Sequence, residues 1–348
     1  MIIDKKSHVF SEGQILSALF LLLSTSSSLF ELGPVIFLIR EYGLPIALLA
    51  GLMYQLGNLL AGIVAISSRR VTACLFISLI LALFSSSSLF LFLLSIVLAS
   101  IGLQKTRRFI QSVNRDRQVG TFLKRFVRIL GFAVCGFFSY AVYPIIIVTV
   151  LVISWYVVLS QVDKTDALPK YHKPHINTFA KIMVIHQTHY FSYAYIMPYV
   201  FLTYLNIERQ LVGLAFAIGW ISYASVEKLL RGERLKVYFI IGHILVAMSL
   251  ILMALFTFNS IVILCAWFIS GLGGGTVFCL TRLNKRAGKD RVDMDVWEDI
   301  GHVVGVTIPL AIMSAGLASP SQLYYISAML ALATGFSMLL SSRGGKLA

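Results

Sequence analysis

The sequence predicts an all-α polytopic membrane protein, with about twelve transmembrane helices in two pseudo-symmetric six-helix bundles. Composition, the spacing of apolar segments and the placement of basic residues support this prediction. Of the 348 residues, 58% are hydrophobic and only 13% are charged, whereas soluble domains are about a quarter charged. Because a helical span needs about 20 apolar residues, twelve spans use roughly 240 residues and leave about a hundred for loops. No room remains for a large soluble domain.

Long apolar segments follow one another along the chain. The first begins after Lys5 and Lys6, as in a signal peptide, but it continues to about Leu38 without a convincing cleavage site, so we expect a retained span. Turn-forming residues separate the later segments. The expected spans cover residues 14–39, 44–66, 71–86, 88–104, 126–142, 144–161, 180–204, 210–227, 237–257, 259–281, 297–316 and 322–341.

The basic residues follow this series of spans. With the N-terminus inside, 27 of the 29 Lys and Arg residues fall in or beside the inner loops, and Arg40 and Arg209 fall outside. Cytoplasmic loops characteristically carry such an excess of Lys and Arg. The pattern predicts an even number of spans, both termini in the cytoplasm and a multi-pass protein of the cytoplasmic (inner) membrane.

The net charge of +14 arises from these loops, so we expect no nucleic-acid partner. The stretch from Lys105 to Arg128 carries eight basic residues among apolar ones, and we expect it to lie on the anionic cytoplasmic leaflet of the lipid bilayer. The four cysteines lie in apolar segments without paired spacing, which argues against a disulfide framework or a zinc knuckle.

The chain divides into two halves of nearly equal length. Residues 1–161 form the expected N-terminal six-helix bundle, residues 162–179 a polar cytoplasmic linker, and residues 180–348 the C-terminal six-helix bundle. In each half the link between the second and third spans is short and basic. We expect the halves to be repeats of one another.

The two basic links contain Arg69 and Arg70 in the first half, and Arg231 and Arg234 in the second. In its two halves, basic links and longer central loop, the chain resembles the major facilitator superfamily of transporters over nearly its whole length. The family's signature Gly and Asp are missing beside Arg69, so the match is architectural. The resemblance implies that these arginines serve gating or helix packing, that the first, fourth, seventh and tenth spans line a central cavity, and that transport is proton-coupled.

The seventh expected span carries a polar aromatic face. At 100° per residue, His186, His189, Tyr190 and Tyr193 fall on one side of a helix and Tyr195 on the opposite side. Imidazole and phenol groups are costly against lipid, so this face is expected to look into a water-filled cavity. The alternative is a helix buried in a bundle, with the tyrosines as packing.

The first expected span presents Ser24, Ser28 and Glu31 on one face, at i, i+4 and i+7. Glu31 is the only carboxylate clearly inside a span, and an intramembrane acid indicates function; alternatively it reaches the interface or Arg40. We expect Glu31 and Ser28 to face the histidines and tyrosines of the seventh span, which together provide a substrate and proton site. Tyr195 is expected to lie away from this site.

Three other segments combine polar or small residues. Gly273, Gly274 and Gly275 in the tenth span predict either a broken helix at a binding site or tight helix packing. Pro198 frees a carbonyl in the seventh span and predicts a bend. The acidic residues that open the eleventh span are expected to cap its helix and to pair with the preceding basic loop. The alternative is that Glu298 and His302, which share a face at i, i+4, form part of an inner gate.

His186 and His189 are also candidate metal ligands. Their i, i+3 spacing places two imidazoles on one face but lacks the second histidine at i+4 and the glutamate of a zinc protease helix. Further ligands would have to come from Glu31, His243 or His302. Proton handling suits histidine better, because it exchanges charge at working pH. The sequence therefore predicts no bound metal and no cofactor.

These features predict a secondary transporter of a small solute. No Lys or Arg lies deep in the four spans expected to line the cavity, so a cationic, zwitterionic or aromatic solute is favoured over an anion. We expect alternating access in a monomer, with protons as the coupling ion. The competing hypotheses are an integral membrane enzyme or a non-transporting scaffold that uses the His/Tyr face. An enzyme is not expected, because no nucleophile, acid or metal set occurs at fixed spacing.

The span assignment predicts which positions are reached from outside the cell. A cysteine placed at Ser68, in an expected inner loop, should stay protected from a membrane-impermeant thiol reagent. Labelling of this position from outside would contradict the twelve-span assignment. Cysteines in the expected outer loops should react, at Gly43, Ser87, Asn206 and Ser319.

Overall fold

The computed structural model describes residues 12–64, 67–113, 121–160, 176–230, 233–288 and 291–341, and within them every regular element is a helix. A 3₁₀ turn at Cys135–Phe137 follows α5, and a π-helical turn at Val200–Tyr204 follows α8. The helices of the first half are α1 (Glu12–Tyr42), α2 (Leu44–Ile63), α3 (Ser68–Leu83), α4 (Leu89–Val113), α5 (Thr121–Ala133) and α6 (Val142–Ser160). Those of the second half are α7 (Thr178–Ala194), α8 (Met197–Tyr199), α9 (Arg209–Leu229), α10 (Leu235–Leu255), α11 (Ser260–Gly274), α12 (Val277–Arg286), α13 (Arg291–Ser314) and α14 (Pro320–Ser341).

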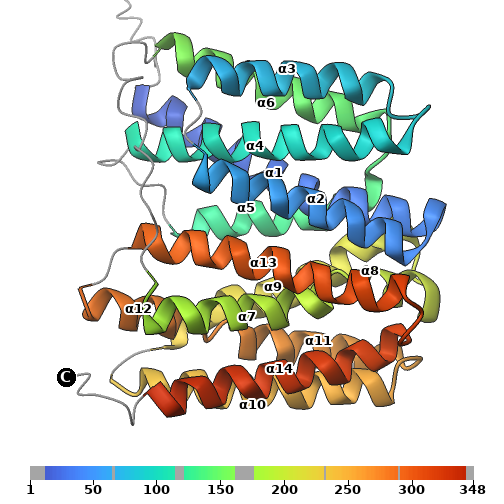
Figure 1. The fold of residues 1–348 in the computed structure, drawn as a ribbon, viewed down its shortest axis with the longest axis vertical. Coiled ribbons are helices and arrows are strands. Elements are labelled where there is room, and N and C mark those ends of the chain that lie inside the picture. The colour runs from blue at the N-terminus through green and yellow to red at the C-terminus, as the bar shows by residue number, and fades with distance from the viewer. Residues whose placement is uncertain are drawn as a thin grey trace, which may run out of the picture.

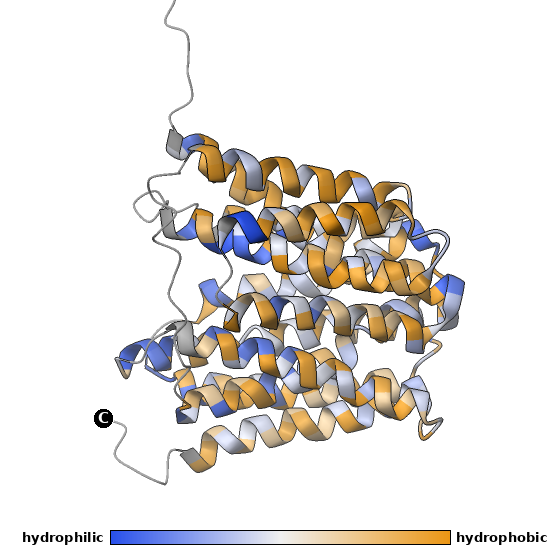
Figure 2. Ribbon diagram, turned by 45° about the horizontal axis from the view of Figure 1, so that its top comes forward, coloured by the Kyte–Doolittle hydropathy of each residue, from blue (hydrophilic) through white to orange (hydrophobic). Residues whose placement is uncertain are grey.

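Nine helices in the described residues are long and apolar enough to cross a membrane. The prediction of an all-helical, multi-pass membrane protein is thereby confirmed. The other three expected spans contain shorter helices, with 16 residues in α3 and 17 in α7. The fifth differs most, because the 13 residues of α5 begin before residue 126 and end at Ala133, whereas the expected span continued to residue 142. Hydrophobic residues cover most of the helix length, and strongly hydrophilic residues gather mainly near helix ends (Figure 2).

The helices lie side by side, with α1–α6 in the upper half of the view and α7–α14 in the lower half (Figure 1). The two groups meet where α2 packs against α13 and where α5 packs against α9. Within the second group, α7 packs against α13 and α14, and α10 packs against α11 and α14. We call the end of the molecule at which α1 begins and α14 ends the terminal end; it lies on the left in Figure 1.

Two expected spans are interrupted in the structure. The bend predicted at Pro198 occurs, because α7 ends at Ala194 and the helix resumes as α8 before the π-helical turn. The glycine-rich span ends as α11 at Gly274 and resumes as α12 at Val277. These glycines also pack tightly, because a Cβ on Gly273 would lie 2.7 Å from Val246 of α10 and one on Gly275 would lie 2.6 Å from the carbonyl of Tyr223; a binding site at this break stays a prediction.

Two glycines of α13 allow it to approach the backbone of α7. A Cβ on Gly301 would lie 2.7 Å from the carbonyl oxygen of Val184, and one on Gly305 would lie 2.7 Å from that of Thr188. Small residues four apart permit such close packing of membrane helices. The contact fixes the polar residues of α13 against those of α7.

This packing predicts that Gly305→Ala destabilises the protein. The added methyl group meets backbone, which cannot rotate away, and overpacking of this kind costs about 1–3 kcal/mol. Gly335→Ala on α14 is the matched control, since its nearest neighbour would lie at 3.4 Å, in ordinary contact. Thermal unfolding in detergent should show a lower midpoint for Gly305→Ala alone; equal midpoints for the two variants would contradict the packing.

Candidate functional site

A small cavity lies between the two halves, beside the middle of α7. Its volume is about 60 Å³, which is enough for a few water molecules. The first half contributes to it from α5, and the second half from α7, α9 and α13. The residues that line it are Arg128, His186, Gln187, Tyr190, Phe191, Trp220, Tyr223, Glu298 and His302.

Arg128 connects this cavity to the acid of the first span. Its guanidinium donates to the carboxylate of Glu31 at 2.9 Å, and Glu31 is buried. The same guanidinium lies 4.4 Å from the ring of Trp220 in α9, a cation–π contact with the second half. Arg128 reaches this position because α5 begins at Thr121, so that residue 128 lies two turns inside the helix.

Ser28 does not join this site, contrary to the prediction that it faces the substrate with Glu31. Its hydroxyl donates to the carbonyl of Ser24 on its own helix, at 3.4 Å. Its Cβ lies where α1 meets α5, and a Cβ on Gly131 would be 2.8 Å from it. Ser28 therefore packs α1 against α5.

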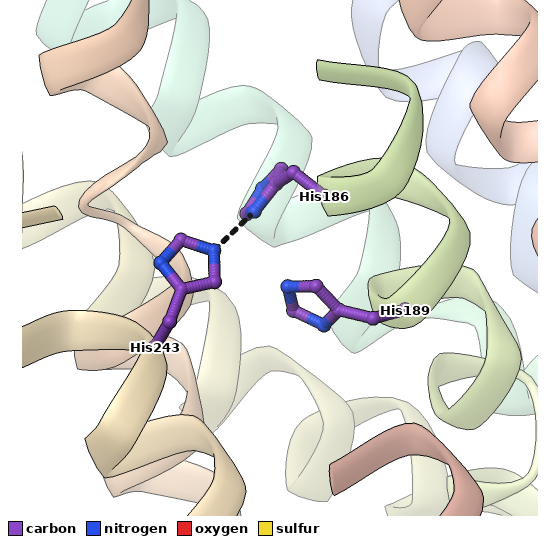
Figure 3. Close-up of side chains that lie close together, drawn as sticks. All are labelled: His186, His189 and His243. Carbon is purple, nitrogen blue, oxygen red and sulfur yellow. Dashed lines mark hydrogen bonds between the residues drawn. The ribbon is translucent and has the colours of Figure 1, made fainter. Parts of the chain in front are cut away.

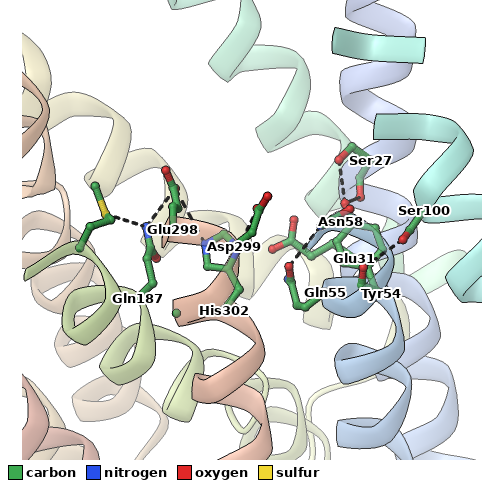
Figure 4. A network of polar contacts seen from close by, with 12 residues as sticks. Ser27, Glu31, Tyr54, Gln55, Asn58, Ser100, Gln187, Glu298, Asp299 and His302 are labelled. Atoms are coloured by element: carbon green, nitrogen blue, oxygen red, sulfur yellow. Dashed lines mark hydrogen bonds and ion pairs between the residues drawn. The ribbon is translucent and has the colours of Figure 1, made fainter. Parts of the chain in front are cut away.

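Glu298 and His302 both line the cavity from α13. Gln187 of α7 donates to Glu298 at 3.0 Å, and nitrogens of His302 lie 3.8 Å from the carboxylates of Glu298 and Asp299. Figure 4 shows this group on one side and the group around Glu31 on the other. The arrangement presents acceptors on α13 and a guanidinium on α5 to one small space.

The polar face predicted for α7 is divided in the structure. His186 and Tyr190 line the cavity. His189 and Tyr193 are instead directed into the second half, where their rings stack with centroids 6.3 Å apart and Tyr193 packs edge-on against Trp267 of α11. The expectation that all four face Glu31 is wrong, because His189 meets His243 of α10 and Tyr193 meets Trp267 of α11, contacts that a helical wheel alone cannot indicate.

Tyr195, predicted on the side opposite the histidines, does not line the cavity, but it has a polar partner in the first half. Its hydroxyl accepts a hydrogen bond from Gln55 of α2 at 2.7 Å, across the interface between the halves. Its ring lies over Gly51, where a Cβ would be only 2.6 Å from it. Asn58 donates in turn to Gln55 at 3.2 Å. The side of α7 opposite the histidines is therefore the side that contacts the first half.

Two ion pairs join the halves near the terminal end. Arg108 of α4 pairs with Asp299 of α13 at 3.1 Å. Arg125 of α5 pairs with Glu227 of α9 and also donates to the carbonyl of Ala224 at 2.8 Å. All four charged side chains are only partly exposed. These pairs close the interface between the cavity and the terminal end.

The arginines predicted to gate do not make these contacts. Arg69 and Arg70 begin α3 and are exposed, and Arg234 precedes α10 and is also exposed. Arg231 lies outside the described residues. In the part of the chain that the structure describes, Arg108 and Arg125 form these ion pairs between the halves, and Arg69, Arg70 and Arg234 do not.

A third histidine joins the two of α7. His186 and His189 lie beside His243 of α10, and one nitrogen from each ring lies within 4.8 Å of the others (Figure 3). All three side chains are buried. The sequence left Glu31, His243 and His302 open as further ligands. Of these three, the structure places His243 in the cluster. This cluster is the group of described residues that could hold a metal.

Several residues of the site were missed by the sequence analysis. Arg128 was assigned to a surface stretch because the fifth span was expected to start at residue 126; the signal that could have found it is the amphipathic run that begins at Thr121. Gln55 and Asn58 are amides within an apolar span and could have been singled out on that ground. Trp220 and Tyr223 resemble ordinary interfacial aromatics in the sequence.

Comparison with known proteins identifies the fold. No protein-family profile and no curated protein sequence matches the chain. Solved structures do match over nearly its whole length. The human organic anion transporter MFSD10 (TETRAN) is 13% identical, with a TM-score of 0.63 over 93% of this chain and 98% of that one.

Two transporters of the POT family are equally similar in structure. PepTSo is 9% identical, with a TM-score of 0.64 over 94% of this chain and 98% of its own. A POT family transporter in complex with 5-aminolevulinic acid is 12% identical, with a TM-score of 0.66 over 95% of this chain and 96% of that one. The chain thus has the fold of the major facilitator type, and these structural neighbours are transporters rather than enzymes.

The bond between Gln55 and Tyr195 predicts coupling across the interface. Tyr195→Phe leaves a buried amide without its acceptor, which costs about 1–3 kcal/mol, whereas Tyr195→Phe in a Gln55→Leu background should cost much less. Thermal unfolding of both single variants and the double variant measures this coupling. Tyr199→Phe is the control on the same segment. Additive effects of the two changes would contradict the contact.

Proposed function

Because the chain has the major facilitator fold, we propose that it is a secondary active transporter that moves a small zwitterionic solute across the cytoplasmic membrane by alternating access. Within the cationic, zwitterionic and aromatic solutes favoured by the sequence, the observation that selects the zwitterion is Arg128. It places a guanidinium on the same cavity as Glu298 and the aromatic rings of Tyr190, Trp220 and Tyr223. Such a cavity offers partners to a carboxylate, an amine and an apolar side chain.

The moving parts are two six-helix halves, residues 1–161 and 180–348, joined by the linker at 162–179. Twelve spans, cytoplasmic termini and a monomeric state belong to this proposal. The described contacts between the halves, at α2–α13 and α5–α9, support it. With the terminal end in the cytoplasm, the basic ends of α4 and α5 lie at the anionic leaflet.

The size of the cavity supports alternating access. Binding pockets for small molecules have volumes of about 300–1,000 Å³, so a cavity of about 60 Å³ excludes the solute until the halves separate. Separation toward the terminal end requires the pairs Arg108–Asp299 and Arg125–Glu227 to break. These two pairs therefore act as the inner gate in this proposal.

In this proposal, proton coupling arises because Glu31 and the carboxylate of the solute compete for Arg128. When the carboxylate of a solute takes the guanidinium, Glu31 loses its partner in a buried position. An unpaired carboxylate is costly there, so Glu31 takes up a proton. Return of Arg128 to Glu31 after the solute leaves releases that proton. Solute and proton then cross together, as expected for a proton-linked carrier.

Transport by purified protein in proteoliposomes tests this proposal. An imposed pH gradient, acidic outside, should drive accumulation of a zwitterion such as a dipeptide or 5-aminolevulinic acid, in preference to organic cations of similar size. The neighbour crystallised with 5-aminolevulinic acid, which carries an amine and a carboxylate, motivates this choice. Arg128→Gln should reduce zwitterion uptake at least tenfold, which corresponds to about 1.4 kcal/mol.

Two further variants separate binding from coupling. Glu31→Gln should retain exchange of solute across the membrane but lose its response to the pH gradient. Arg40→Gln, at the exposed end of α1, is the matched control and should transport normally. Accumulation of organic cations instead of zwitterions, or full zwitterion transport by Arg128→Gln, would contradict the proposed site.

A further inference from the structure

The histidine cluster inside the second half has the form of a metal site. His186 and His189 project from one face of α7, and His243 projects from α10 toward them (Figure 3). The ring centroids are 4.9, 5.1 and 5.2 Å apart, and each pair of rings is close to perpendicular, at 88°, 72° and 83°. The three imidazoles thus form a triangle whose nitrogens face a common space.

His243 is already oriented as a ligand. Its Nδ1 lies 2.7 Å from the carbonyl oxygen of Phe239, one turn earlier on α10. A carbonyl only accepts, so Nδ1 carries the proton and Nε2 presents a lone pair to the cluster. His186 Nδ1 donates to that lone pair at 2.9 Å. Metal-ligating histidines are typically held in this way, by a hydrogen bond from the second ring nitrogen to a backbone carbonyl.

His189 supplies an independent observation. Its side chain is fully buried, and neither ring nitrogen has a hydrogen-bond partner among the described residues. Buried polar groups are almost always bonded, and one left unsatisfied calls for an explanation. The neighbours that its ring does contact are His186, His243 and Tyr193. A cation shared with the other two imidazoles would satisfy it.

We propose that His186, His189 and His243 bind one first-row divalent transition-metal cation, with Zn²⁺ as its representative, inside the second half. Three imidazole nitrogens favour Zn²⁺ and its neighbours over Mg²⁺ and Ca²⁺, which require oxygen ligands. Tetrahedral Zn–N bonds of about 2.0–2.1 Å place ligand nitrogens roughly 3.3 Å apart. The present spread of up to 4.8 Å closes to that value by rotation of the rings. The fourth position is left to water.

The position of the site decides its role. His186 also lines the cavity, so the cation can enter from there. The ligands lie on α7 and α10, both in the second half, so the metal ties these two helices and does not link the halves. It therefore stiffens α7 next to the cavity as a resident structural ion, and it is distinct from the transported solute.

Zinc content and thermal stability test the site without any transport assay. Protein purified in detergent, stripped with a chelator and dialysed against ZnCl₂ should retain one zinc per chain and unfold at a higher temperature than the stripped protein. MgCl₂ and CaCl₂ should have no effect. CoCl₂ should give the visible absorption of tetrahedral cobalt. His189→Gln and His243→Gln should lose retained zinc, the zinc-dependent shift and the cobalt spectrum.

His302→Gln is the matched control, a half-buried histidine of α13 outside the cluster, and it should keep all three signals. Size-exclusion elution reports whether each variant is folded; if the cluster variants do not fold, the wild-type zinc shift and cobalt spectrum decide alone. Absence of both from the wild type would overturn the site. Equal zinc retention by His189→Gln would overturn it as well. Movement of zinc through proteoliposomes would overturn the resident role.

Discussion

The ion pair between the buried carboxylate of Glu31 and the partly exposed guanidinium of Arg128 constrains the rest of the interior. A buried carboxylate is tolerated when it is paired and is costly without its partner. α1 and α5 therefore stay together at this point. Because Arg128 also lies against the ring of Trp220, one side chain connects the acid of the first half to the second half. The cavity between the halves is bounded by that contact.

The contacts between the halves differ in strength along the interface. Near the terminal end, Arg108–Asp299 and Arg125–Glu227 are partly exposed pairs, and exposed pairs contribute only about 0–1 kcal/mol. Deeper in, the neutral bond from Gln55 to the hydroxyl of Tyr195 is buried and more costly to leave unmade. An interface closed by weak pairs at one end can open there reversibly, as a carrier requires.

The fold was more predictable from the sequence than the site. Apolar segment length and the basic loops indicated the all-helical membrane class, because lipid imposes both constraints directly. Glu31 was recognised as a candidate because a carboxylate within an apolar span is energetically costly. The helical wheel placed His186 and His189 together and Tyr195 on the opposite side, but it could not tell which neighbours pack on each side of α7, so the contact of Tyr195 with Gln55 of the first half was missed. Arg128 was missed because a single helix boundary decides whether it lies at the surface or inside.

Distance measurement with spin labels tests most directly whether the two halves rock about this cavity. The four native cysteines are changed to serine, and labels are placed at the exposed residues Arg69 and Lys285 at the terminal end, or Tyr42 and Leu317 at the opposite end. Both arginines of the ion pairs between the halves are then changed to glutamine. The distance at the terminal end should lengthen while that at the opposite end shortens. Two unchanged distances, or lengthening at both ends, would contradict alternating access about the cavity.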